Sequence, residues 1–191
     1  MSRTSSAEVE APDGAERWTP PRLESEIVSY ASETREEYES TLGQLDLDRI
    51  HWDVSRRLFR AGGYCRSRIE EGPTHEIVVS YPAYIYWGWD RVKEIVRHEM
   101  VHAVVFEEYG PDAAPHGDEF RALARRVNAP LRGEEALPYR FELLCSVCGR
   151  FLDGLYEPSV RTKSPREYRS NCCMAPLEVD EKRSYHELRE F

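Results

Sequence analysis

His98, Glu99 and His102 form an H-E-x-x-H motif, whose residue types can bind a metal ion and activate a water molecule. On an α-helix, residues four apart lie on the same face one turn apart, so both histidines can bind one ion. Zinc bound by imidazole nitrogens at about 2 Å lowers the pKa of its water to about 7. Glu99 can take the proton from that water as general base and pass it to the leaving amine. The motif therefore predicts Glu-assisted attack of zinc-bound water on peptide bonds.

A catalytic zinc ion needs a third protein ligand and one open coordination position. Besides many carboxylates, the candidates are His51, His75, His116 and His186. His116 is the best placed because it follows the motif after a turn and a short loop, which lets the chain fold back. Gly117 beside it would permit a close backbone approach. We therefore expect His98, His102 and His116 to bind the catalytic zinc.

Other interpretations of the motif remain open. An H-E-x-x-H sequence can occur by chance on an ordinary helix, but this helix is otherwise apolar, and burying two histidines and a glutamate would be costly without a role. A second interpretation is a non-catalytic nucleic-acid-binding or protein-binding module with purely structural zinc. A third is a small-peptide or other zinc hydrolase.

The elements that must position the motif follow from hydrophobic periodicity and turn signals. In chain order they are helices at about 22–42 and 46–60, strands at 64–69 and 75–81 forming a hairpin, and helices at about 91–109 and 117–127. Asp90 is the expected N-cap of the helix that carries the motif, and Gly110 its end. Cleft lining and core packing explain a group of aromatic residues before this helix equally well. These residues are Tyr84, Tyr86, Trp87 and Trp89.

The composition limits the classes of protein to which this chain can belong. The 191 residues carry a net charge of −9, and an acidic chain is a poor candidate for tight nucleic-acid binding through charge alone. No run approaches the roughly 18 apolar residues that span a bilayer, and the N-terminus lacks an apolar signal core. We therefore expect a cytoplasmic protein with no membrane partner; its oligomeric state is not readable. An arginine-rich, lysine-poor composition with an acidic surface suggests a salt-adapted, archaeal protein.

The cysteines indicate a second metal site. An odd number, five, with a C-x-x-C pair and no signal peptide favours metal binding over disulfides. Cys145-x-x-Cys148 followed by Gly149 is typical of one knuckle of a zinc ribbon. The second half is irregular, and Cys172 and Cys173 can complete a structural zinc site as adjacent ligands. Alternatively, one of that pair binds with His186 or water, or the ribbon binds no metal. We expect the remaining cysteine, Cys65, to be a buried, small apolar residue.

Basic and aromatic residues alternate in the C-terminal part. Together they can hold single-stranded DNA by phosphate contacts and base stacking. An ordinary solvated surface is the alternative, since Asp153, Glu157 and Glu167 dilute the charge. The candidate DNA-binding residues are Arg150, Arg161, Lys163, Arg166 and Arg169, with Tyr156 and Tyr168 among them.

The segments Arg97–Ala103, which reads R-H-E-M-V-H-A, and His116–Phe120, which reads H-G-D-E-F, resemble the SprT-like family of zinc metallopeptidases. This family, which includes SprT and Spartan, has the pattern H-E-[LM]-x-H-A, a short loop and H-G-x-x-[FW]. The resemblance covers about residues 24–178, including the glycine-rich turn before the hairpin. If Cys173 matches the last cysteine of the family's ribbon, Ser170 stands at the position of the family's third cysteine.

The resemblance implies an α+β fold in which a compact zincin-like metalloprotease domain, made of helices and a small antiparallel sheet, precedes a zinc-ribbon-like β module. It implies zinc bound by His98, His102 and His116, with Glu99 as catalytic base. Spartan-type members cut proteins crosslinked to DNA, so it also implies a protein substrate and DNA as a partner. The expected organisation is a disordered tail at 1–20, the zincin domain at 21–132, the ribbon module at 138–180 and a tail at 181–191.

Overall fold

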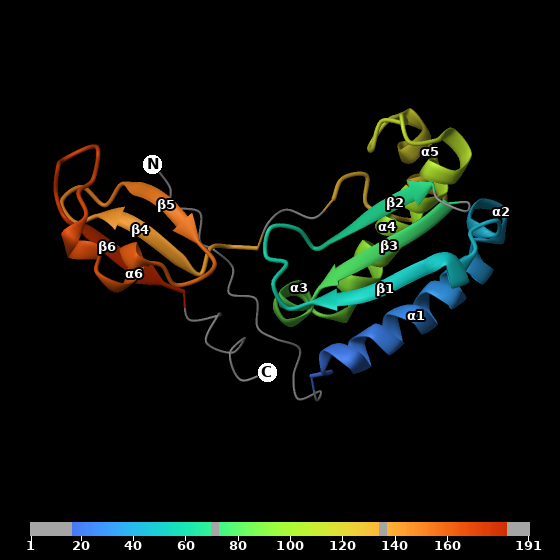
Figure 1. The fold of residues 1–191 in the computed structure, drawn as a ribbon, viewed down its shortest axis with the longest axis horizontal. Coiled ribbons are helices and arrows are strands. Elements are labelled where there is room, and N and C mark those ends of the chain that lie inside the picture. The colour runs from blue at the N-terminus through green and yellow to red at the C-terminus, as the bar shows by residue number, and fades with distance from the viewer. Residues whose placement is uncertain (1–16, 70–72, 134–136, 183–191) are drawn as a thin grey trace. The chain divides into compact units, whose positions relative to one another are not determined.

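A computed structural model describes residues 17–69, 73–133 and 137–182, and the chain divides into two compact units, residues 1–137 and 138–191. The first unit contains α1 (Pro20–Glu37), α2 (Glu39–Leu42), the 3-10 helix η1 (Leu47–Arg49), β1 (Ile50–Ser55), β2 (Gly63–Ile69), β3 (Pro73–Ser80), α3 (Tyr81–Trp87), α4 (Trp89–Tyr109) and α5 (Asp118–Arg126) (Figure 1). This mixture of helices and a small sheet confirms the predicted α+β class.

The sheet of the first unit has the strand order β1-β3-β2. Strands β2 and β3 pair antiparallel, as predicted for the hairpin, with Cys65 opposite Ile77 and Ser67 opposite His75. Strand β1 pairs parallel with β3, so the sheet is mixed and not antiparallel as expected. The reason is the connection: residues 56–62 carry the chain from β1 past β3 to the opposite edge instead of turning back in a hairpin. Strand β2 is therefore an edge strand.

The helix predicted at 46–60 is wrong. Only η1 forms there, with Asp46 accepting a hydrogen bond from the backbone N–H of Asp48, and the chain then enters β1. Ile50 and Val54 are buried in the core while the alternate residues of β1 are more exposed, which is the period-two pattern of a half-buried strand. Two β-branched residues at that spacing favour the strand once β3 is present to pair with it.

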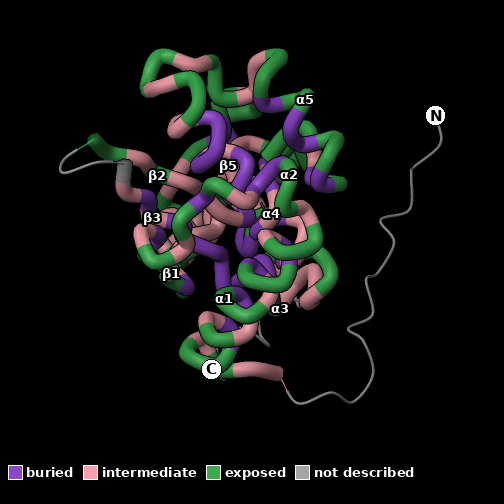
Figure 2. Tube along the Cα trace, turned by 90° about the vertical axis from the view of Figure 1, so that its right-hand side faces the viewer, coloured by how far each residue is buried: buried purple, intermediate pink, exposed green. Residues whose placement is uncertain are grey.

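Helix α4 is the central element of the first unit. It packs against α1, α3, α5, β2 and β3, and much of it is buried (Figure 2). Its N-cap is Gly88, with φ of 81°, and not Asp90 as predicted; the Asp90 carboxylate instead pairs with Lys93 at 2.6 Å. Gly110, with φ of 82°, ends the helix as expected, in a left-handed conformation that glycine adopts without strain.

Of the aromatic residues considered before α4, Tyr84 and Trp89 pack in the core, and the cleft lining includes none of the four. The Trp18 ring stacks on Tyr84 with 5.8 Å between centroids and meets Trp89 edge-on at 5.1 Å. Tyr84 belongs to α3, a short helix that was not expected and that Ser80 caps through its side chain. Residues 1–16 of the predicted tail lie outside the described residues, whereas Trp18 within that predicted tail packs against the core.

The second unit is a small antiparallel sheet with strand order β5-β4-β6. Its elements are β4 (Phe141–Cys145), β5 (Phe151–Leu155), α6 (Val160–Lys163), the 3-10 helix η2 (Pro165–Glu167) and β6 (Leu177–Glu181). Within the described residues 138–182, the buried apolar side chains are few: Phe141, Leu143, Cys145, Ala175 and Leu177. Together with a cluster of four cysteines, this arrangement is compatible with the predicted zinc-ribbon-like module.

Candidate metal centres and active site

The structure brings His98, His102 and His116 together. Helix α4 places the first two one turn apart, and the loop after it returns His116 to the same point. The Nε2 atom of His98 lies 3.1 Å from Nε2 of His102 and 3.1 Å from Nε2 of His116. Three ring nitrogens converging on one point would repel each other as lone pairs, whereas a cation between them satisfies all three. Imidazole donors of this number fit zinc and leave one coordination position open.

The ring of His98 is held by the backbone beyond α5. Its Nδ1 lies 2.8 Å from the carbonyl oxygen of Pro130, which accepts the Nδ1 proton and leaves Nε2 free as a ligand atom. Nothing in the sequence could have identified this contact, because the acceptor is a main-chain carbonyl.

Phe120 forms the wall behind the three histidines. It is fully buried, and its ring centroid lies 4.8, 4.4 and 4.9 Å from those of His98, His102 and His116. One turn of α5 therefore explains the spacing of H-G-x-x-F: Phe120 follows His116 by four residues and packs against the ring it accompanies. At Gly117, a Cβ atom would lie 3.1 Å from the Cβ of Ala114, so the expected close backbone approach is present.

Burial favours the neutral form of the three imidazoles. It lowers the pKa of His98. It also lowers the pKa of His102 to about 3, where the neighbouring His98 and His116 act in the same direction. The pKa of His116 is lowered by burial first and then by the nearby Arg121 and Arg132 guanidinium groups. Since metal binding requires the unprotonated ring, this environment prepares the cluster for a cation.

Glu99 is buried beside the histidines, with only 5% of its surface exposed. Burial raises the pKa of its carboxyl to about 8, while a hydrogen bond from the backbone N–H of Cys65 acts in the opposite direction. This contact requires β2 to lie close to α4. At Gly63, a Cβ atom would come within 2.7 Å of the Ile95 side chain, so glycine permits the approach.

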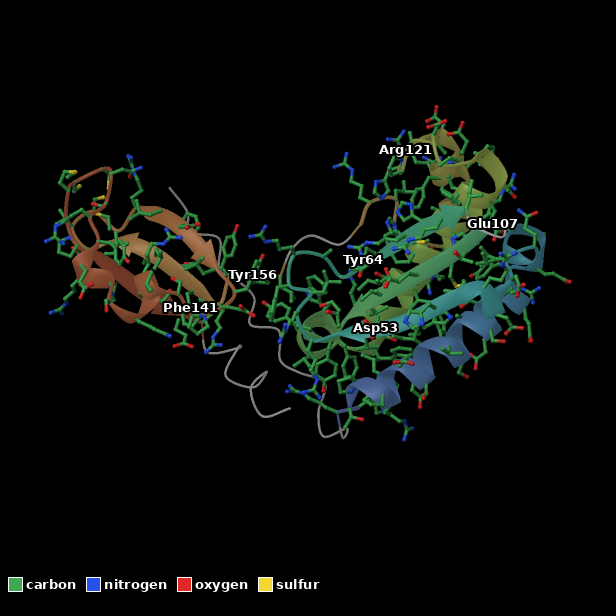
Figure 3. The ribbon with its side chains drawn as sticks, viewed as in Figure 1. Asp53, Tyr64, Glu107, Arg121, Phe141 and Tyr156 are labelled. Carbon is green, nitrogen blue, oxygen red and sulfur yellow. The ribbon has the colours of Figure 1, made fainter. Side chains whose placement is uncertain are left out.

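A cleft of about 380 Å³ opens over these residues. Its lining includes Glu99 and all three histidines, together with Tyr64, Cys65 and Ser67 of β2. Figure 3 labels Tyr64 on this strand. Cys65 is half-buried, packs against the core and also faces the cleft, and burial raises the pKa of its thiol to about 12. Its role is therefore broader than the purely apolar one expected.

The other histidines considered as ligands do not join the cluster. His51 is exposed on β1, and His75 is buried on β3 between Ser67 and Glu107. His186 lies outside the described residues. The third position of the cluster is taken by His116, as the spacing had suggested.

The four C-terminal cysteines also meet. The Sγ atoms of Cys145, Cys148, Cys172 and Cys173 all lie within 4.8 Å of one another, and each thiol is free of disulfides. Ser170, at the position where the family pattern has a cysteine, is buried and is not one of the four. Its hydroxyl accepts a hydrogen bond from the N–H of Ala175 at 3.1 Å, and it lowers the pKa of the Cys145 thiol. It thus shapes the turn that presents the adjacent cysteines.

The five candidate DNA-binding residues fall into two groups. Arg161 pairs with Asp153 at 2.6 Å, and Arg169 donates to the carbonyl oxygens of Arg166 and Tyr168. The side chains of Arg150, Lys163 and Arg166 show no such partner within the described residues. An aromatic cluster lies on the same unit: the Tyr139 ring stacks with Phe151 at 6.0 Å and contacts Tyr156 at 5.2 Å. The sequence interpretation included only Tyr156 of these three.

No helix in the described part of the chain is long and apolar enough to cross a membrane.

Comparison with known proteins identifies the family. The search of curated proteins finds no match. Among protein families, the SprT-like family matches residues 29–140, more than half of the chain and the whole segment that holds Glu99 and the three histidines. The chain therefore belongs to the SprT-like family, which is of metallopeptidase type.

Proposed function

We propose that the protein is a zinc-dependent endopeptidase in which Glu99 is the general base. The observation that carries this proposal is the convergence of three imidazole nitrogens beside a buried carboxyl in an open cleft. A purely structural metal site would not need a cleft or a free acid at its edge. Four-ligand closed sites are typical of structural zinc, whereas three protein ligands and an open position are typical of catalytic zinc.

The residues of the cleft have distinct roles in the proposed hydrolysis. His98, His102 and His116 would hold zinc, which supplies a Lewis acid for the attacked carbonyl and for water. Glu99 takes the proton from the attacking water and later donates it to the leaving amine nitrogen. Burial raises the pKa of this carboxyl above its usual range, and this makes its carboxylate a stronger base toward the water proton than an ordinary glutamate. Phe120 and the Pro130 carbonyl fix the rings that orient this chemistry.

Hydrolysis of an unfolded protein such as casein by the full-length chain tests the proposal. We expect cleavage by the zinc-loaded protein, its loss after 1,10-phenanthroline treatment and its return on adding zinc. His116→Ala should lose one equivalent of zinc and the activity, whereas the matched control His51→Ala, on an exposed histidine outside the cleft, should keep both. Cleavage that survives chelation or the His116 change would contradict a metal-dependent mechanism.

We further propose that single-stranded DNA binds the second unit and that proteins held on DNA are among the substrates. The aromatic cluster supports this, because Phe151 is 50% exposed and Tyr139 is 39% exposed. Gly154 makes room for it: a Cβ atom there would lie 2.0 Å from the Tyr139 ring. Exposed aromatic rings together with cationic side chains on the same unit are the features that bind bases and phosphates without sequence preference.

Phe151→Ala is expected to weaken binding of an oligo-dT strand by about tenfold or more, since stacking contributes about 1–3 kcal/mol per base. Arg150→Glu and Arg166→Glu should weaken it further and reduce its salt dependence. Fluorescence anisotropy of labelled DNA measures both effects. Val28→Ala, an exposed apolar residue of the first unit, serves as control. Equal affinity for the wild type and all three variants would remove DNA from the proposed function.

A further inference from the structure

A chain of hydrogen bonds outside the metal centre links the edge strand β2 to α4. Ser67 Oγ lies 2.8 Å from Nδ1 of His75, and Nε2 of His75 lies 3.0 Å from a carboxylate oxygen of Glu107. Figure 3 labels Glu107 near the end of α4. The side chain of His75 is completely buried, so it bridges the strand and the helix without access to solvent. None of the three residues takes part in the metal cluster.

The direction of these hydrogen bonds follows from their donors and acceptors. A carboxylate oxygen accepts, so the imidazole tautomer that fits this contact carries its proton on Nε2 and directs it to Glu107. The unprotonated Nδ1 then accepts the hydroxyl proton of Ser67. The proton of Ser67 is thereby directed into the protein, and its oxygen keeps its accepting capacity. The Sγ atom of Cys65 lies 3.8 Å from that oxygen, so the two can form only a weak hydrogen bond.

Ser67 also lines the cleft that contains Glu99 and the three histidines. It follows Cys65 by two residues, about 7 Å along the strand. The lining also includes Val105 and Phe106, which follow His102 by three and four residues, about 5–6 Å along α4. Gly110 and Pro111 belong to the same lining. These four residues carry no polar side chain, whereas Ser67 contributes a hydroxyl.

We propose that Ser67 is a specificity-determining residue, which offers a hydrogen-bond acceptor to the side chain of a bound peptide about two residues from the scissile bond. Donor-bearing side chains such as Gln or Asn are preferred over apolar side chains of similar size. His75 and Glu107 are positioning residues, because they hold the hydroxyl proton away from the cleft. The inference rests on the proposed peptidase function and names the substrate class of the same cleft.

Peptide pairs that differ only by Gln against Met, or Asn against Leu, at one position near the scissile bond test the proposal. One hydrogen bond is worth a preference of about 2- to 12-fold. We expect the full-length wild type to show this preference in kcat/KM at one position and Ser67→Ala to reduce it to about one. Ser67→Thr, which keeps the hydroxyl, should retain it. Ser25→Ala, on the exposed side of α1, should leave the preference unchanged.

The proposal is overturned if Ser67→Ala slows both members of every pair equally, which would indicate a structural role, or if the preference survives it. Binding of the same peptides to zinc-loaded Glu99→Gln protein, measured by calorimetry, gives a readout independent of turnover. If the wild type cleaves nothing, the peptidase proposal fails, while the binding ratio of Glu99→Gln against the Glu99→Gln, Ser67→Ala double variant still decides the role of Ser67.

Two changes at Glu107 test whether His75 and Glu107 position the Ser67 hydroxyl. Glu107→Gln keeps an amide oxygen that can accept the Nε2 proton, so the preference should persist. Glu107→Leu removes the acceptor and releases the ring proton to either nitrogen, so the preference should fall. Thermal melting of both variants shows that they are folded. Identical preferences in the two would contradict the positioning role of His75 and Glu107.

Discussion

Replacing Glu99 with glutamine is expected to lower peptide hydrolysis by about a thousandfold while both zinc sites remain filled. General base catalysis typically contributes about 10²- to 10⁴-fold, and glutamine has the shape of glutamate but cannot take up the proton. The amide can still accept the hydrogen bond from the Cys65 N–H, so the local structure should persist. The measurements are kcat/KM on a peptide substrate and zinc content per chain.

The outcome separates the candidate functions. A binding module with structural zinc would lose nothing in Glu99→Gln, whereas a peptidase loses turnover and keeps zinc. Glu33→Gln, an exposed glutamate of α1, is the matched control and should leave the rate unchanged. Loss of zinc together with activity in Glu99→Gln would mean that the carboxyl holds the metal, which contradicts its assignment as a base.

The same variant has a stability signature in the metal-free protein. The Glu99 carboxyl has a pKa of about 8 when folded, against the ordinary value of 4.5 for a glutamate in water, so folding takes up a proton between these pH values. The wild type therefore loses stability as pH rises through this window, by on the order of 5 kcal/mol in full. Glutamine removes this loss, so the melting temperature of Glu99→Gln should exceed that of the wild type increasingly from pH 5 to pH 8.

The buried histidines act in the opposite sense, since their lowered pKa values cost stability as pH falls below about 6.5. They are present in both proteins, and the difference between the two melting curves therefore isolates Glu99. A constant difference across this pH range would show that the carboxyl is ionised in the folded, metal-free state.

Local spacing predicted the parts of the site that lie close together in the sequence. His98 and His102 are one helical turn apart, and a long apolar helix ended by Gly110 could be predicted from periodicity. The return of the chain to His116 required only a short loop. The edge hairpin was also readable, because its two β-prone runs are separated by a turn signal.

Contacts between distant segments could not be predicted from the sequence. The strand β1 was taken for a helix because its identity depends on pairing with β3, which lies more than twenty residues away. The Pro130 carbonyl and the Cys65 N–H are backbone groups, so their residue types carry no signal. His75 was a metal candidate by type alone; its partners, on β2 and α4, lie 8 and 32 residues away.

We expect the second unit to depend on metal binding by its cysteine cluster for stability. Three short strands and a handful of buried apolar side chains provide little hydrophobic stabilisation, and units of this size usually need a metal or disulfides. The adjacent Cys172 and Cys173 reach a common point with Cys145 and Cys148 because Ser170 holds the turn that carries them. Structural zinc contributes about 10–16 kcal/mol in small metal-binding domains, more than such a unit can replace by packing.

Cys145→Ser is therefore expected to unfold residues 138–182 while the first unit keeps its fold and its own zinc. Zinc content should fall from two equivalents to one, and NMR spectra should lose the dispersed signals of β4, β5 and β6 only. Cys172→Ser and Cys173→Ser should each behave in the same way if both thiols are ligands. If either variant keeps its second equivalent of zinc, the replaced thiol is not a ligand and another group completes the site. Cys65→Ser, which changes the cysteine outside the cluster, should retain two equivalents. A second unit that stays folded with one equivalent in the wild type would show that the ribbon is held by packing alone.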